Sequence, residues 1–140
     1  MKTKYLYMLL LAPLLSFAEL NIEKVNEALS SIESNKKLSY FSNNKNLLTK
    51  LKIKKTASIK KADILLFPKS KSSKKIIIVD SYSKLKENKK SIGAIYVKKG
   101  RTQIMFVDER LKKNGLRISN KKYRISECHL NPICFLKLTK

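Results

Sequence analysis

Two kinds of hydrophobic pattern alternate along this chain. In 22–34 and 45–51 the apolar residues recur every three or four positions, which predicts two amphipathic helices. In 62–67 and 76–79 the apolar residues are almost continuous, and each run is bounded by polar or Pro-containing segments. Short continuous runs are typical of strands that are buried on both faces, so they predict a partly parallel sheet covered by helices.

A hairpin is predicted in the second half of the chain. The apolar-rich segments 92–98 and 102–107 flank Lys99-Gly100, and a short Gly-containing link between two such runs favours a tight turn. A weaker alternation predicts another short strand at 38–41. The basic stretch 52–61 stays open between a strand and a loop.

Polar residues with capping chemistry stand where these patterns change. Asn114-Gly115 gives a strong signal for a helix end. The expected N-caps are Asn21, Asp80 or Ser81, Asp108, and Ser119 for a last helical turn through Tyr123 and Ile125. The predicted order is α-β-α-β-β-α-β-β-α. The expected fold class is a single small α/β domain, a three-layer, sandwich-like arrangement of a mixed, partly parallel sheet flanked by helices.

The first eighteen residues have the layout of a secretory signal peptide. Lys2 and Lys4 precede an apolar run at 6–15, and Ser16-Phe17-Ala18 places small residues before a cleavage site. The run is roughly 10 residues long, against about 20 for a membrane-spanning helix. We therefore expect cleavage after Ala18, a periplasmic domain over 19–140, and no retained anchor.

The formal net charge of +22 indicates attraction to anionic partners, which include nucleic acid, lipopolysaccharide, anionic lipid or an acidic protein face. Only four of the 32 basic residues are arginine, the residue preferred for bidentate recognition of phosphates and bases. Few arginines and export both argue against nucleic-acid binding. A weak, salt-screened attraction to anionic membrane surfaces is expected. Drift in an A/T-rich genome remains an alternative source of the many lysines.

The two cysteines, Cys128 and Cys134, predict a disulfide because they form an even pair in an exported chain. Closing so short a loop is worth about 2 kcal/mol in the chain-entropy model. His129 lies between them, but a structural zinc site needs four ligands and this segment offers three. Zinc and two free thiols remain the alternatives, and the bond is either a staple or a redox sensor.

No catalytic constellation is evident in the sequence. The one histidine lies beside the cysteines, so a nucleophile would lack its usual base. Three glycines are too few for a phosphate-binding loop. Carboxylates that could form an acid/base pair have simpler roles as caps or solvated charges; they are Asp63, Asp80, Glu87, Asp108 and Glu109. We predict no enzyme activity, no cofactor and no metal.

The segment 91–119 carries a recognisable signature. It reads as a glycine-led apolar strand, a turn, a strand that ends in Phe and a polar cap, then a helix followed by Gly-Leu-x-Ile-Ser. This pattern resembles the C-terminal part of the YfiR-like periplasmic family. The matching residues are Gly93, Gly100, Phe106, Asp108, Gly115, Leu116, Ile118 and Ser119.

The resemblance implies a non-enzymatic periplasmic regulator. Proteins of this type bind the periplasmic sensor domain of an inner-membrane diguanylate cyclase and hold it inactive, so an inner-membrane sensor of cyclase or kinase type is the expected partner. The segment 76–86 and the hairpin also resemble one lobe of a periplasmic solute-binding protein. That alternative requires a homodimer or a shallow site. A basic envelope protein that binds anionic lipid is the third hypothesis.

Overall fold

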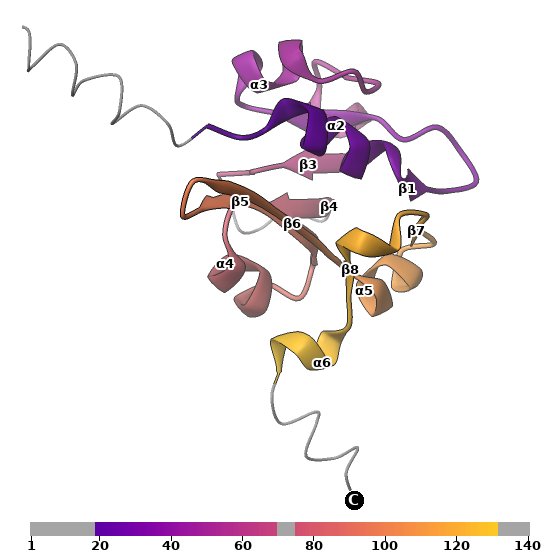
Figure 1. Cartoon of the computed structure of the whole chain (residues 1–140). Coiled ribbons are helices and arrows are strands. Elements are labelled where there is room, and N and C mark those ends of the chain that lie inside the picture. Colours follow the sequence, from indigo (N-terminus) through magenta and orange to yellow (C-terminus); the bar gives the residue numbers. More distant parts are fainter. Residues whose placement is uncertain (1–18, 70–74, 132–140) are drawn as a thin grey trace, which may run out of the picture.

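The computed structural model describes residues 19–69 and 75–131. The predicted signal peptide (1–18) and Cys134 lie outside the described residues. The described chain forms a single α/β domain with a six-stranded mixed sheet packed against helices (Figure 1). The predicted fold class is therefore confirmed.

The elements are short, as the short apolar runs predict. The strands are β1 (Ile32–Glu33), β2 (Tyr40–Ser42), β3 (Ile64–Leu66), β4 (Ile76–Val79), β5 (Ser91–Lys98), β6 (Arg101–Val107), β7 (Arg117–Ile118) and β8 (Arg124–Ile125). The helices are α2 (Ile22–Ser30), α3 (Lys45–Lys50), α4 (Tyr82–Glu87), α5 (Asp108–Lys113) and α6 (Glu127–Leu130), with 3₁₀ turns η2 (Ile59–Lys61) and η3 (Lys121–Tyr123).

The main sheet has the order β2-β3-β4-β5-β6-β8. Strands β2 to β5 are parallel, β6 runs antiparallel to β5, and β8 pairs in parallel with the end of β6. Strands β1 and β7 form a separate antiparallel pair. At the outer edge of β2, Tyr40 forms a bridge with Lys55, so the ambiguous stretch 52–61 partly covers that edge.

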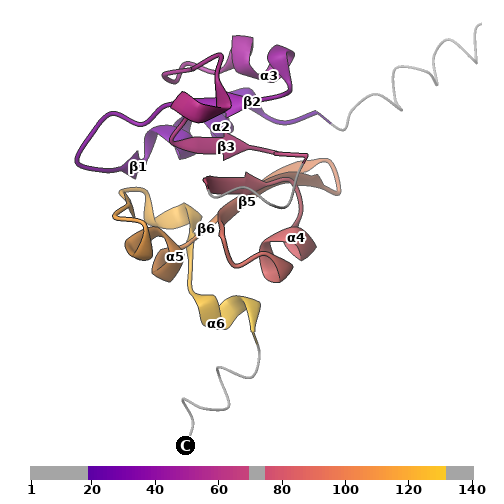
Figure 2. The ribbon, with the colours of Figure 1, turned by 180° about the vertical axis from the view of Figure 1, so that it is seen from behind.

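Two hydrophobic clusters lie on opposite faces of the sheet. On one face, α2 and α3 bury Val25, Leu29 and Leu47 against Ile64 and Phe106. On the other face, Leu85 of α4 and Leu130 of α6 pack against the sheet. Figures 1 and 2 show helices above and below the sheet, which is the three-layer arrangement. We call these the α2 face and the α4 face.

The caps show where local sequence rules succeed. The Asn21 side chain accepts a hydrogen bond from the N–H of Lys24, and Ser81 does the same for Lys84, so both predicted caps are confirmed. Asp108 is a correction: α5 begins at Asp108 itself, without a side-chain cap. Its carboxylate instead lies 2.9 Å from Lys112 Nζ, one helical turn along. At this position the negative charge also interacts favourably with the positive, N-terminal end of the helix dipole.

The last helical turn, predicted to be capped by Ser119 and to run through Tyr123 and Ile125, is present only as a 3₁₀ turn that ends at Tyr123; the Ser119 cap and the extension to Ile125 are wrong. The 3₁₀ turn η3 begins after Asn120, whose side chain caps Lys122, and the chain then extends into β8. Ser119 instead donates its N–H to the carbonyl of Ser31, 2.9 Å away. Pairing with β6 overrides the weak local helical pattern, because it satisfies backbone groups that a short helix would leave open.

The signature glycines have structural reasons. A Cβ on Gly93 would lie 2.3 Å from Phe106 Cδ1 and 2.5 Å from the carbonyl oxygen of Met105. Gly93 and Phe106 are direct neighbours across the β5–β6 ladder, and Phe106 is fully buried. The bare backbone of Gly93 therefore makes the space that the Phe106 ring fills.

Gly115 ends α5 in a left-handed conformation with φ of 70°. The N–H of Gly115 bonds to the carbonyl of Lys112, and that of Leu116 bonds to the carbonyl of Leu111. These two bonds form a Schellman motif, which also brings Leu111 and Leu116 together in the core. The next residues pair through Ile118 with β1. The signature residues around Gly115 therefore serve folding.

We predict that Gly93→Ala lowers the free energy of unfolding by about 2–3 kcal/mol, because the new methyl group overpacks the sheet against Phe106. Denaturant unfolding measures this. Gly100→Ala is the control. A Cβ at this position meets no atom within 4 Å, and only the positive φ of 76° disfavours the substitution, so we expect the free energy of unfolding to fall by about 1 kcal/mol. An equal loss in the two variants would contradict the packing role of Gly93.

Candidate functional site

Most of the acidic side chains are committed to ion pairs. All ten Asp and Glu residues lie within the described ranges, and six of them pair with Lys or Arg. Glu109 accepts the backbone N–H of Glu127 at 2.8 Å. Basic residues outnumber acidic ones about three to one, so many cations have no acidic partner. A binding site for an anionic group is therefore to be looked for among these cations.

Among the described residues, Arg110 is the one buried cation, with 6% of its surface exposed. Its Nε and Nη2 donate to the two carboxylate oxygens of Glu127, each at 2.8 Å. Its Nη1 donates to the carbonyls of Leu85, Asn88 and Ser91 at 2.8–3.2 Å. The guanidinium joins α5 to α6 and to the α4–β5 connection, so it has a structural role.

This contact also changes the acidity of Glu127. The hydrogen bonds from Arg110 hold the pKa of Glu127 below its ordinary value of 4.5. A lowered pKa in the folded state stabilises the fold above pH 4.5, and that contribution is lost as the pH falls through the folded-state pKa.

Asp63 forms a second structural cluster. Its carboxylate accepts the N–H and hydroxyl of Ser39 at 2.9 and 3.0 Å, and Lys36 Nζ lies 2.7 Å away. Burial works to raise the pKa of Asp63, but the hydrogen bonds from Lys36 and Ser39 outweigh it and the pKa is lowered. This carboxylate joins the start of β2 to the segment before β3.

The tip of the β5–β6 hairpin gathers three cations without an acidic partner. Lys98 and Arg101 face each other across the ladder, and Lys99 lies between them in the turn. None of the ion pairs among the described residues includes any of the three. Like charges directly opposite one another destabilise a strand pair, so the hairpin carries this cluster at a cost to its stability.

The turn itself holds Lys99 in an unfavourable backbone conformation. Lys99 has φ of 52°, and it is one of two non-glycine residues in the described chain with positive φ. Two-residue hairpin turns of this type favour Asn or Asp followed by Gly, because residues with a larger side chain disfavour the left-handed region. The other such residue, Phe67, follows β3.

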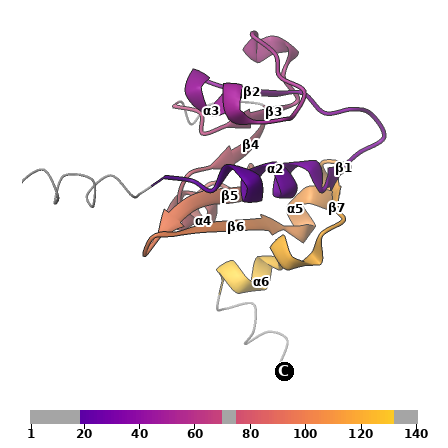
Figure 3. The same cartoon turned by 45° about the horizontal axis from the view of Figure 1, so that its top comes forward.

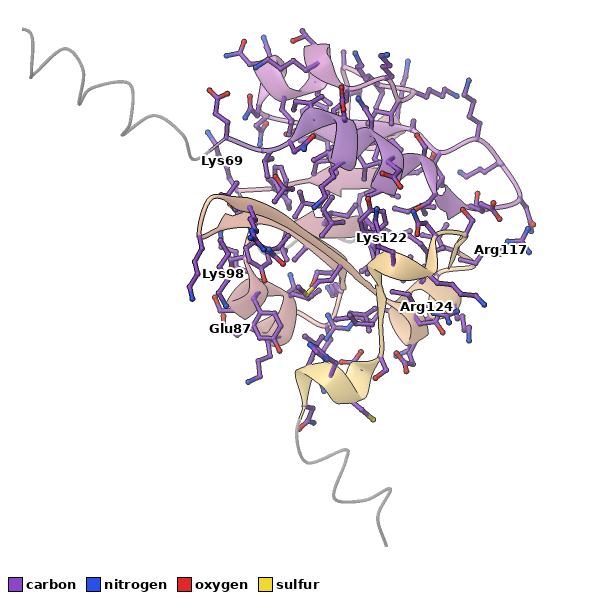
Figure 4. All side chains as sticks on the ribbon, in the orientation of Figure 1. Lys69, Glu87, Lys98, Arg117, Lys122 and Arg124 are labelled. Carbon is purple, nitrogen blue, oxygen red and sulfur yellow. The ribbon has the colours of Figure 1, made fainter. Side chains whose placement is uncertain are left out.

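An open cleft of about 450 Å³ lies beside this tip, lined by Lys98, Lys99, Arg101 and Gln103. In Figure 4, Lys98 lies at the end of the hairpin on the side that carries α4. Further along the same face, Tyr96 stands opposite Gln103. We call these four lining residues the hairpin cluster.

Other clefts also lie among the described residues. One of about 300 Å³ lies on the α4 face. Ile77 and Val79 line it with apolar side chains, and its polar lining residues are Lys69, Lys84, Glu87 and Asn88. This cleft is close to the carboxyl ends of β3 and β4, the usual ligand position in open α/β sheets. Another, of about 330 Å³, lies between the end of α2 and the segment before β2.

The predicted disulfide remains a prediction, because Cys134 lies outside the described residues. Cys128 lies in α6 and is not a free thiol. His129, in the same helix, accepts a hydrogen bond from the Tyr82 hydroxyl through its backbone carbonyl at 3.5 Å. In the described ranges, no three His, Cys, Asp or Glu side chains are grouped to hold a metal ion. None of the described helices could cross a membrane.

Comparison with models of protein families, with curated proteins and with solved structures finds no match for this chain. The resemblance to YfiR-like proteins therefore depends on the signature residues alone. The structure brings these residues together as parts of the fold and does not gather them into a binding site.

The hairpin cluster was missed at the sequence level because its lysines look like any others in a lysine-rich chain. Two signals were nevertheless present in the sequence Lys98-Lys99-Gly100-Arg101. Lysine stands where a tight turn favours Asn or Asp, and the flanking residues are both basic although the ladder sets them opposite each other. Arg110 was missed because nothing local marks a buried arginine.

We predict that Glu127→Gln lowers the free energy of unfolding by about 1 kcal/mol at pH 7, because an amide cannot pair with the Arg110 charge. The difference from the wild-type protein should shrink as the pH falls below 4.5 and through the lowered pKa of Glu127. Denaturant unfolding across this pH range measures it. Asp80→Asn, which breaks an exposed pair with Lys84, is the control and should cost only a few tenths of a kcal/mol.

We predict that Arg101→Glu raises the free energy of unfolding by about 0.5 kcal/mol, because it turns a repulsive cross-strand pair with Lys98 into an attractive one. Thermal and denaturant unfolding at low salt measure the gain. Lys60→Glu, on the exposed turn η2, changes the net charge equally but has no cross-strand partner. Equal gains in both variants would show that only net charge matters.

Proposed function

We propose that this chain is an exported, non-enzymatic interaction protein that binds the periplasmic part of an inner-membrane sensor, as its resemblance to YfiR-like proteins implies. The observation that carries the proposal is the hairpin cluster. Three cations that belong to none of the ion pairs of the described residues stand together at a turn where they repel one another, and Lys99 in that turn has a positive φ. Strain and repulsion of this kind persist where a bound partner makes use of them.

The surroundings of the hairpin cluster favour a protein partner. Gln103 follows Arg101 on the same face of β6, and Tyr96 lies opposite it on β5. Arginine and tyrosine are enriched in protein interfaces, and Arg101 and Tyr96 supply them here. Opposite charge on the partner would speed the encounter and orient it.

A small-ligand-binding module is the second candidate. It is supported by the cleft at the carboxyl ends of β3 and β4, which has apolar lining residues and charges of both signs, from Lys69, Lys84 and Glu87. Such a module would be stabilised against unfolding by its ligand.

The partner can be captured from the cells that make the protein. A photo-crosslinking amino acid replaces Gln103 in one variant and Ile59 in another. Ile59 is the matched control, because it is exposed and lies in η2, far from the hairpin in the sequence. After crosslinking and washing in high salt, mass spectrometry identifies the attached proteins.

We predict that the Gln103 variant enriches one inner-membrane sensor protein and that the Ile59 variant does not. A sensor with a cyclase or kinase output would support the regulator. Crosslinks to many unrelated proteins from both positions, or to none, would contradict the proposed function. Thermal stabilisation by a small molecule would then favour the ligand-binding module.

A further inference from the structure

In the part of the chain that the structure describes, the outer edge of β6 has no strand partner next to the hairpin cluster. Thr102 on this edge is nevertheless 8% exposed, and its hydroxyl accepts the backbone N–H of Asn21 at 2.8 Å, so Ile104 is more accessible on this edge than Thr102 is. Strand β8 pairs only with Phe106 and Val107, at the end of β6 away from the turn. Among the described residues, no strand pairs with the outer side of 101–104. Figures 1 and 3 show the hairpin tip at one end of the sheet, away from α5 and β7.

The ladder register decides which backbone groups point outward from β6. Lys98 and Arg101 close a two-residue turn and exchange hydrogen bonds, and bonded and non-bonded pairs then alternate along an antiparallel ladder. Gln103 therefore bonds to β5, whereas Thr102 and Ile104 direct their N–H and C=O groups away from it. The same alternation turns Phe106 toward β8, as the observed pairing requires.

We propose that this edge, 101–104, binds an acidic, extended segment of the partner protein as an added strand of the sheet. The inference rests on the proposed function and deepens it by naming the chemistry of recognition. Backbone groups of Thr102 and Ile104 would supply hydrogen bonds, and the hairpin cluster would select negative charge. Addition of a strand to an open edge is a common mode of peptide recognition.

The two faces of β6 set the pattern of the added strand. Arg101 and Gln103 line the cleft on the α4 face, so acidic side chains are favoured there. Ile104 packs against the cluster on the α2 face, so apolar side chains are favoured beside it. Because successive residues of a strand point to opposite faces, the partner segment alternates acidic and apolar residues.

Charge excludes the simplest other occupant, a second copy of this chain. Two copies paired through this edge would bring two sets of Lys98, Lys99 and Arg101 to one short interface, and each chain has a formal net charge of +22. Like charges opposed across an interface cost binding energy. An acidic segment removes the repulsion that the hairpin cluster has in the free protein.

Amide hydrogen exchange of the chain 19–140 tests the inference, read by NMR at Gln103 and Ile104. The probe is the peptide Glu-Val-Glu-Val-Glu-Val-Glu with blocked ends. In the free protein, the Ile104 amide should exchange rapidly and the Gln103 amide slowly. Saturating peptide should slow Ile104 exchange by about tenfold or more, because its N–H joins a ladder, and should leave Gln103 nearly unchanged.

Two matched controls separate a ladder from simple attraction of charges. A peptide that is N-methylated at alternate residues, in either register, keeps its charge but cannot complete the ladder, and should bind about tenfold more weakly. Arg101→Glu should weaken binding of the parent peptide about fivefold or more, whereas Lys60→Glu should change it less than twofold. Because Arg101→Glu is expected to stabilise the fold, unfolding cannot account for the loss.

Several results would overturn the inference. Slow exchange of the Ile104 amide in the free protein would place another part of the chain on this edge. Unchanged exchange of the Ile104 amide with saturating peptide would show that no ladder forms. Equal affinity for the parent and N-methylated peptides would show that charge alone binds them. Binding of phosphatidylglycerol vesicles but not of the peptide would replace it with a membrane-surface site. If the peptide protects the Ile104 amide but no sensor protein is captured by crosslinking, only the proposed function is contradicted. If a sensor protein is captured but the peptide does not protect Ile104, only the added strand is contradicted.

Discussion

The fold depends on one buried cation. Arg110 bonds with Glu127 and with three carbonyls of the α4–β5 connection, so a single guanidinium holds α6, α5 and the start of β5 in register. Planar geometry and five donors allow arginine to satisfy this many acceptors at once, which a lysine cannot do. A chain with so many lysines therefore uses one of its four arginines where a buried charge must be fully bonded.

The positively charged side chains of this protein lie in two different environments. Cations such as Lys36 and Lys112 are neutralised by nearby carboxylates and serve local stability. At the hairpin tip the same charge is left unpaired, beside a strained turn and an open strand edge. The opposite edge of the sheet is different, since Lys55 bridges to Tyr40 there. Among the described residues, one edge of the sheet is therefore partly covered, and the other has no strand partner next to the hairpin tip.

The signature that resembles YfiR-like proteins consists of positions that fold the chain. Gly93 accommodates the Phe106 ring, and Gly115 ends α5 so that Leu116 reaches the core. Such residues preserve an architecture while the exposed surface changes. Function therefore has to be argued from surface features, here the hairpin cluster and the β6 edge.

Local sequence determined much of this protein. Apolar runs placed β3 and β4, polar residues such as Asn21 and Ser81 placed helix starts, and Gly115 ended α5, because these signals act within a few residues. Tertiary structure decided the rest. The burial of Arg110 and the unpaired outer side of β6 depend on which strands and helices meet, and that is set by packing across the whole domain.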